Sequence, residues 1–258
     1  MLKPIRPAAP IQARYEGRLF DALQAMHRAI LREVTAQWKR DTPETIIAAD
    51  LIPAKALQQA ISRMGRIWLR KFDDLSESMA EHFALAVRQR SDRALADMLR
   101  KGGFSVRFKM TAAMRDAYAA IRAENVGLIR TIPQQYLAKV EVLVMQSVSQ
   151  GGKLSDLSTA LERNYGVTKR RAQMIARDQN AKATAVMVKT RHVELGITTA
   201  KWLHSAGGKH PRPEHVAFSG KTYDIRTGHD FGDGAGPVWP GTAINCRCVS
   251  IPVMPWDA

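Results

Sequence analysis

Two short stretches near the C-terminus guide the interpretation of the chain: residues 202–215 read WLHSAGGKHPRPEH, and residues 244–249 read INCRCV. With the segment between them, they hold four of the seven histidines and both cysteines. Glycine and proline are frequent here, and helical periodicity is absent. Short strands are predicted at 199–203, 221–225 and 246–253, where β-prone residues stand between turn residues. We therefore expect a small C-terminal α+β unit made of short strands and ordered loops.

Upstream of Gly196 the sequence is organised in amphipathic helices, because apolar residues recur every three or four positions. In the first helix this stripe consists of Leu19, Leu23, Met26, Ile30, Val34 and Trp38. Helices are predicted over 15–40, 53–85, 91–100, 111–130, 134–149, 154–163 and 168–195. Breaks are expected at Pro133 and in a tight turn at 164–166. The predicted fold class is α+β, mainly α.

The expected domain organisation has three parts. Residues 1–12 contain Pro4, Pro7 and Pro10, which predict an extended proline-rich arm. Residues 13–150 form a helical region, and residues 151–258 form the C-terminal domain.

The chain is strongly basic, with a formal net charge of +15 and a pI near 10.2. Residues 201–258 carry a net charge of only +1, against +5 for 150–200 and +9 before residue 150. Basic helices favour contact with nucleic acid, although solvated helix faces are an equally simple explanation.

Lys169, Arg170 and Arg171 begin the helix that follows the expected tight turn. This pattern is compatible with a helix–turn–helix that contacts DNA, and equally with any αα-hairpin that has glycine in its turn. The three residues are therefore candidate DNA contacts.

Cys246 and Cys248 are too close in sequence for ordinary disulfide geometry, which favours a reducing compartment. On a strand both sulfurs would point to one side, so zinc ligation by Cys246, Cys248 and His215 is one hypothesis. His204, His210 and His229 are further possible ligands. The alternative is a pair of small reduced cysteines that pack against the loop. No other cofactor is expected.

His215 also stands beside Glu214 and close to Arg212. Together these residue types can supply a general base and an anion-binding group. They make a metal-dependent nuclease a competing hypothesis. No paired acidic cluster for Mg²⁺ is present, so no catalytic residue is assigned. In the structural alternative, His215 bonds to loop backbone and Arg212 bridges a carboxylate or a carbonyl.

The motif Asn245-Cys246-Arg247-Cys248 resembles the Asn-Cys-Arg-Cys signature of the phage Mu F-like head morphogenesis (minor head protein) family. Other elements follow the order of that family. They are the helix segment 175–180, Trp202, Arg212 with His215, Gly220, and the loop residues Phe231, Pro237 and Pro240. The resemblance covers about residues 120–252. An acidic residue usual in the family before the Arg-x-x-His element is replaced here by Gly207-Gly208-Lys209-His210.

The resemblance implies a non-enzymatic minor head protein of a tailed phage or prophage, located in the head interior or at the portal vertex. It implies association with portal protein, with scaffold or major capsid protein, and with double-stranded DNA without sequence specificity. It also implies roles in prohead assembly and DNA delivery. Neither a signal peptide nor a membrane-spanning run is recognisable, so synthesis in the host bacterial cytoplasm and no membrane partner are expected.

Two rival functions remain at this stage. Related modules can be joined to toxin domains, but only ten residues follow Cys248, so no toxin domain is expected. A pure DNA-binding protein would show salt-sensitive binding with little sequence preference.

Overall fold

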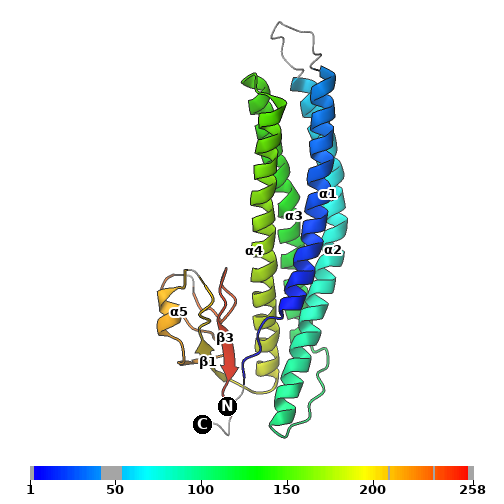
Figure 1. Ribbon diagram of the computed structural model, residues 1–258. Coiled ribbons are helices and arrows are strands. Elements are labelled where there is room, and N and C mark those ends of the chain that lie inside the picture. Colours follow the sequence, from blue (N-terminus) through cyan, green and yellow to red (C-terminus); the bar gives the residue numbers. More distant parts are fainter. Residues whose placement is uncertain (1–2, 42–53, 209, 235, 255–258) are drawn as a thin grey trace. The chain divides into compact units, whose positions relative to one another are not determined.

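The computed structural model describes residues 3–41, 54–208, 210–234 and 236–254, so the helix start predicted at Pro53 lies outside them. The chain divides into two compact units. The helical unit consists of Tyr15–Met79 and Asn125–Ile175. The mixed unit consists of Met1–Arg14, Ala80–Glu124 and Ala176–Ala258. The described residues confirm a mainly helical α+β fold (Figure 1).

Four long helices supply most of the ordered residues: α1 (Ala9–Asp41), α2 (Ala54–Lys101), α3 (Ala112–Ser149) and α4 (Leu154–Glu194). Helices α2, α3 and α4 contribute to both units, whereas most of α1 lies in the helical unit. The two compact units therefore differ from the predicted division at residue 150. No helix among the described residues is long and apolar enough to span a bilayer.

The helical unit has an apolar core into which α1 places its predicted stripe. All six stripe residues, from Leu19 to Trp38, are at most 5% exposed. A polar link lies among them, because His27 contacts the Tyr136 hydroxyl through Nδ1 at 2.7 Å and Glu162 through Nε2 at 2.9 Å. Buried hydrogen bonds of this kind stabilise one particular alignment of α1, α3 and α4.

The predicted break at Pro133 is wrong, because α3 continues through this residue. Proline removes one helical hydrogen bond and strains the preceding turn. Here it is buried, and the neighbouring Ile129, Ile132 and Tyr136 are at most 1% exposed. Burial of this apolar face outweighs the local cost of the proline.

The predicted turn at residues 164–166 is also wrong, and with it the helix–turn–helix, because α4 is continuous. The amide of Asn164 donates to the Tyr136 carbonyl at 3.3 Å instead of shaping a turn. Thr168 donates to the Asn164 carbonyl within the helix at 3.0 Å instead of capping a new one. Likewise, α2 runs through residues 86–90, which contain no helix breaker.

The N-terminal arm is shorter than predicted and belongs to the mixed unit. Helix α1 already begins at Ala9, with Pro10 in the first turn, where a missing N–H has no cost. Asn180 on α4 donates to the Ala8 carbonyl at 3.1 Å, and Ile5 packs against the core of the mixed unit. Ile5 and Ala8 are thus held against the mixed unit.

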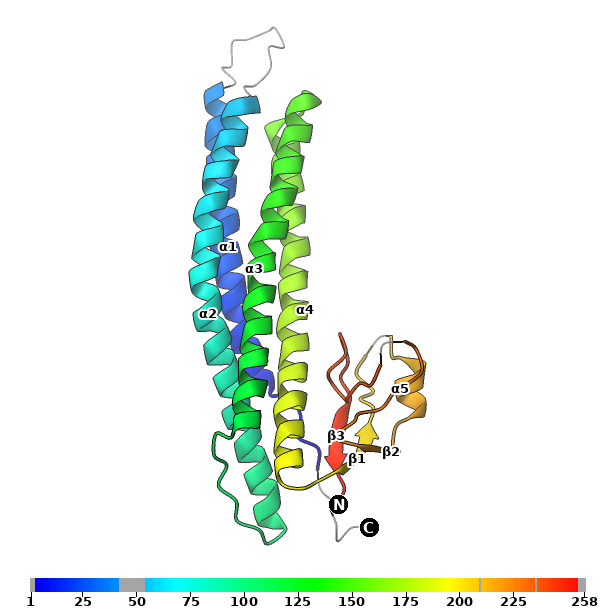
Figure 2. The same cartoon turned by 180° about the vertical axis from the view of Figure 1, so that it is seen from behind.

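The sheet of the mixed unit has three antiparallel strands in the order β2–β1–β3 (Figure 2). Strand β1 (Thr199–Leu203) has the predicted bounds, while β2 (Thr222–Asp224) and β3 (Val249–Pro252) are shorter than predicted. In the register, Lys201 pairs with Thr222 on one side and with Ile251 on the other. The core of this sheet includes Leu95 and Leu99 of α2.

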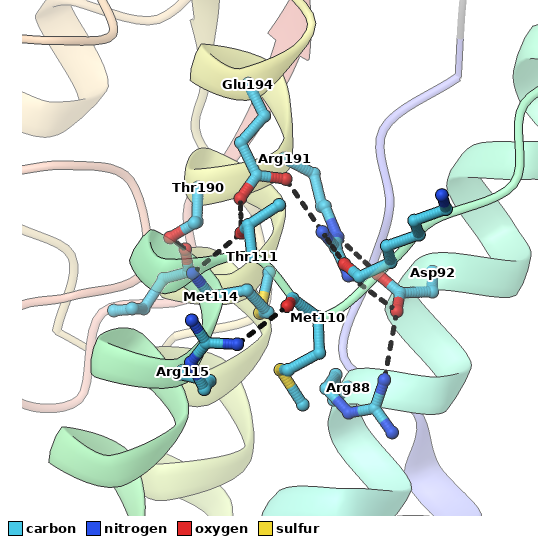
Figure 3. Close-up of polar contacts among 11 residues, drawn as sticks. Arg88, Asp92, Met110, Thr111, Met114, Arg115, Thr190, Arg191 and Glu194 are labelled. Atoms are coloured by element: carbon cyan, nitrogen blue, oxygen red, sulfur yellow. Dashed lines mark hydrogen bonds and ion pairs between the residues drawn. The ribbon is translucent and has the colours of Figure 1, made fainter.

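Arg191 joins the segments of the mixed unit and is only 1% exposed (Figure 3). Its guanidinium donates to both carboxylate oxygens of Asp92, at 2.8 and 3.0 Å, to Glu194 at 2.7 Å and to the Lys109 carbonyl at 2.9 Å. It therefore ties α2 and the connection before α3 to the end of α4. Loss of one partner of such a buried pair typically costs about 3–5 kcal/mol.

Candidate metal centre

Trp202 forms the base of the site on the central strand β1 and is fully buried. Four aromatic rings meet it at steep angles, with centroid distances of 4.9 Å to His215, 5.9 Å to Phe218, 5.8 Å to Tyr223 and 5.3 Å to Phe231. Edge-to-face contacts of this kind have a defined geometry. The indole therefore positions the helix and loops that surround β1.

His215 lies on α5 (Pro213–Ala217), a five-residue helix with proline at its first position. Its ring is 4% exposed and stacks on Phe231 at 4.8 Å. The residue after α5, Phe218, packs on Trp202, and the chain then turns at Gly220, which has φ +87° and donates to the Trp202 carbonyl at 2.7 Å. The sequence from Pro213 to Gly220 thus directs the His215 imidazole inward.

Asn245 fixes the approach to the two cysteines. It has a left-handed backbone with φ 59°, a conformation that asparagine tolerates better than most residues. Its N–H donates to Asp178 Oδ1 at 2.5 Å, and its side-chain oxygen accepts from Arg177 at 3.0 Å. The helix segment 175–180 and the Asn-Cys-Arg-Cys motif are therefore one structural element, although 67 residues separate Asp178 from Asn245.

Two arginines hold the neighbouring loops. Arg212 donates to the Ile244 carbonyl at 3.1 Å, which agrees with the predicted structural role of this residue. Arg247 is exposed and donates to the Gly207 carbonyl. Each arginine connects the Asn-Cys-Arg-Cys turn to a loop that flanks α5.

Cys246, Cys248 and His215 form a buried cluster of possible metal ligands. Each is 4% exposed, and their ligand atoms all lie within 4.8 Å of one another. His215 Nδ1 is 3.6 Å from the Cys246 sulfur and 3.7 Å from the Cys248 sulfur. His204 joins from the end of β1, with Nδ1 3.6 Å from the Cys248 sulfur. These are the nitrogen and sulfur donors that zinc takes in proteins.

The surroundings favour negative charge on one sulfur. A hydrogen bond from the Cys248 thiol lowers the pKa of Cys246 to about 5 and raises the pKa of Cys248 itself. The Gly241 N–H also donates to the Cys246 sulfur, at 3.4 Å. Gly241 has φ +86°, and a Cβ there would lie 3.1 Å from the Cys248 carbonyl oxygen, so only glycine brings this N–H close.

A cavity of about 40 Å³ lies beside the cluster, bordered by His204, His210 and Arg212 among others. One water molecule occupies about 30 Å³ in the liquid. The cavity therefore has room for an ion or a water.

Most residues predicted from the sequence converge here: Trp202, Arg212, His215, Gly220, Asn245, Cys246, Arg247 and Cys248 all lie in or beside the site. Cys246 and Cys248 precede β3 instead of lying on it, so their common direction comes from the turn at Asn245. His229 instead stacks on Phe218 at 3.7 Å. His204 was named only among the further possible ligands, although its position two residues after Trp202 places it on the same side of an extended chain.

Lys169, Arg170 and Arg171 lie on α4 within the helical unit, outside this cluster. Lys169 and Arg170 are exposed, although the Lys169 ammonium also lies 4.8 Å from the Phe20 ring centroid. Arg171 is half-buried, donates to Thr131 at 2.8 Å, and burial lowers its pKa. Two of the three candidate DNA contacts are thus exposed.

Residues 138–251 match the family model described as phage Mu protein F-like protein. This match supports the family that the Asn-Cys-Arg-Cys motif suggested. An uncharacterized protein of Haemophilus influenzae is 36% identical over 135 residues. That alignment covers 52% of this chain but only 29% of the relative, so the chain spans less than a third of that protein. No solved structure matches the chain.

The left-handed turn at Asn245 predicts an order of stability for two substitutions. Asn245→Ala and Asn245→Gly both remove the contact with Arg177, but alanine also resists a positive φ. Asn245→Ala should therefore lower the free energy of unfolding by about 1 kcal/mol more than Asn245→Gly. Urea unfolding followed by tryptophan fluorescence measures the difference. A glycine variant as unstable as the alanine variant, or less stable, would contradict the importance of this backbone conformation.

Proposed function

We propose that this chain is a non-enzymatic head morphogenesis protein of a tailed phage or prophage, which associates with portal protein and with packaged DNA during prohead assembly and DNA delivery. The observation that carries the proposal is the match of residues 138–251 to the phage Mu protein F-like family. Scaffold and major capsid protein are further candidate partners. The site of action is the virion, in the head interior or at the portal vertex.

The distribution of charge supports contact with DNA. Most of the net charge of +15 lies before residue 201, in the part of the chain that builds the long helices. On α2, Lys55, Arg63 and Arg66 border a shallow surface recess of about 400 Å³ together with uncharged polar side chains. Such basic helix faces suit phosphate contacts that ignore sequence. The loss of the predicted helix–turn–helix also favours binding without sequence recognition.

The geometry around His215 supports a non-enzymatic role over the metal-dependent nuclease. The imidazole and both sulfurs are buried, and a cavity of about 40 Å³ lies beside them. A phosphodiester of duplex DNA would have to reach side chains of residues that are each only 4% exposed. His215 therefore suits a structural role better than that of a general base.

The proposed DNA contact predicts a smaller salt dependence of binding for Lys169→Gln/Arg170→Gln. Each lost phosphate contact should reduce the slope of log K against log salt by about one, so the double variant should lose about two. Fluorescence anisotropy with random-sequence duplex DNA measures this slope.

The matched control is Lys221→Gln/Arg226→Gln, which removes two exposed charges from the mixed unit. It should leave the slope unchanged. Equal slopes for wild type and the Lys169/Arg170 variant would refute these contacts, and salt-independent or absent binding would refute the DNA association.

The portal association predicts co-purification. When the chain is co-expressed with the portal protein of the same phage or prophage, it should elute with portal rings in size-exclusion chromatography and be present in purified heads. Hexamers of the major capsid protein, used in place of portal protein, serve as the comparison. A chain that neither binds portal nor enters particles would overturn the proposal, as would plasmid nicking that disappears in His215→Ala.

A further inference from the structure

We infer that His204, His215, Cys246 and Cys248 form a closed, tetrahedral zinc site whose role is structural. The inference goes beyond the head-protein proposal and does not depend on it. It rests on the separations of the donor atoms, on their chemical types and on the segments of chain that they join.

The donor separations fit ligands around one zinc ion. Zinc–sulfur bonds of about 2.3 Å and zinc–nitrogen bonds of about 2.0–2.1 Å, at a tetrahedral angle, place sulfur and nitrogen about 3.6 Å apart. Three of the four nitrogen–sulfur distances among these ligands, all except the one between His204 and Cys246, are 3.6, 3.6 and 3.7 Å.

Hydrogen bonding alone explains this pattern poorly. His215 Nδ1 is nearly equidistant from two sulfurs, at 3.6 and 3.7 Å. A single ring nitrogen has either one proton or one lone pair, so it can make one good hydrogen bond and not two. An ion bound between the three atoms would accept the single lone pair of the nitrogen and would also bind both sulfurs.

The types of donor select the metal. Two thiolates and two imidazoles in a tetrahedral arrangement are typical of zinc, whereas Mg²⁺ and Ca²⁺ require oxygen ligands. The cluster of three mutually close ligand atoms contains no carboxylate. The Gly241 N–H at 3.4 Å from the Cys246 sulfur is the kind of outer contact that supports a metal-bound thiolate.

His204 is the residue placed to close the fourth position. It is half-buried, and its Nδ1 lies 3.6 Å from the Cys248 sulfur. The ligand atoms of His215, Cys246 and Cys248 all lie within 4.8 Å of one another, and His204 is not part of that group. The His204 ring therefore has to move toward these three residues to bind the same ion. Its backbone N–H is held by Ser219 at 3.1 Å, which leaves the side chain to make this movement. His210 borders the same cavity but is exposed, which makes it the natural control.

The four ligands join segments that have little regular structure of their own. His204 follows β1, His215 lies on the five-residue α5, and the cysteines lie between the turn at Asn245 and β3. An isolated helix of that length is not stable in water, and short strands contribute few ladder hydrogen bonds. An ion that binds all three segments in the folded state stabilises their arrangement.

Metal analysis of the full chain tests the inference. The protein is purified under reducing conditions with a streptavidin-binding tag, because a polyhistidine tag binds zinc itself. Inductively coupled plasma mass spectrometry should find one zinc per chain. Replacement by cobalt should produce the intense visible bands of tetrahedral Co²⁺ with thiolate charge transfer in the near ultraviolet. Zinc removal should lower the melting temperature of the wild type by about 10 °C or more.

Variants then identify the fourth ligand. Competition with a chromophoric chelator should show zinc affinity lower by at least about 100-fold in His204→Ala, more than the loss of an outer-shell partner causes, and unchanged in His210→Ala. Circular dichroism of the long helices reports whether each variant is folded. If Cys246→Ser does not fold, the cobalt spectrum of the wild type still tests whether thiolates bind the metal. Protein without zinc and without a thiolate–cobalt band would overturn the site. Wild-type affinity in His204→Ala would overturn its closure by His204.

Discussion

The burial of Trp202 at the centre of β1 is the interaction on which the mixed unit depends. Its fully buried indole contacts one residue of α5, the residue that follows α5, one residue of β2 and one of the following loop. Truncating a buried tryptophan to alanine typically costs about 3–5 kcal/mol, which is a large fraction of the stability of a domain. Because His215 and Tyr223 pack against this ring, both the sheet and the donor cluster follow from its position.

Much of this unit could be predicted from local signals. The bounds of β1 come from residue types at short spacing, and the close pair of cysteines could be identified from the sequence, although their common direction comes from the turn at Asn245 and not from a strand. What could not be predicted depends on contacts across long sequence separations. Asp178 and Arg177 hold Asn245 from 67 and 68 residues away, and Leu95 of α2 completes the core around Trp202. No periodicity within the C-terminal region indicates these partners.

In the helices, the apolar stripes and most of the outer ends are correct, whereas the predicted internal breaks are wrong. Pro133 and Gly166 are breakers by local propensity, yet both lie inside long helices. At these points tertiary packing outweighs local helix propensity, because Pro133 is buried and the Asn164 amide donates to the Tyr136 carbonyl. For the same reason the predicted helix–turn–helix does not form, so the basic residues of α4 belong to a continuous helix face. The DNA contact that we propose for this face would be electrostatic and independent of base sequence.

We propose two roles for two parts of the chain: basic helix surfaces contact partners, and a buried Cys/His cluster holds zinc and stabilises a small fold. The proposed zinc site is structural and closed by four protein ligands. X-ray absorption spectroscopy at the zinc edge of the purified full chain distinguishes such a closed site from an open one. A closed site gives two sulfur ligands at about 2.3 Å and two imidazole nitrogens at about 2.0–2.1 Å. A spectrum with fewer than two sulfurs, or with one imidazole and a water oxygen, would contradict it.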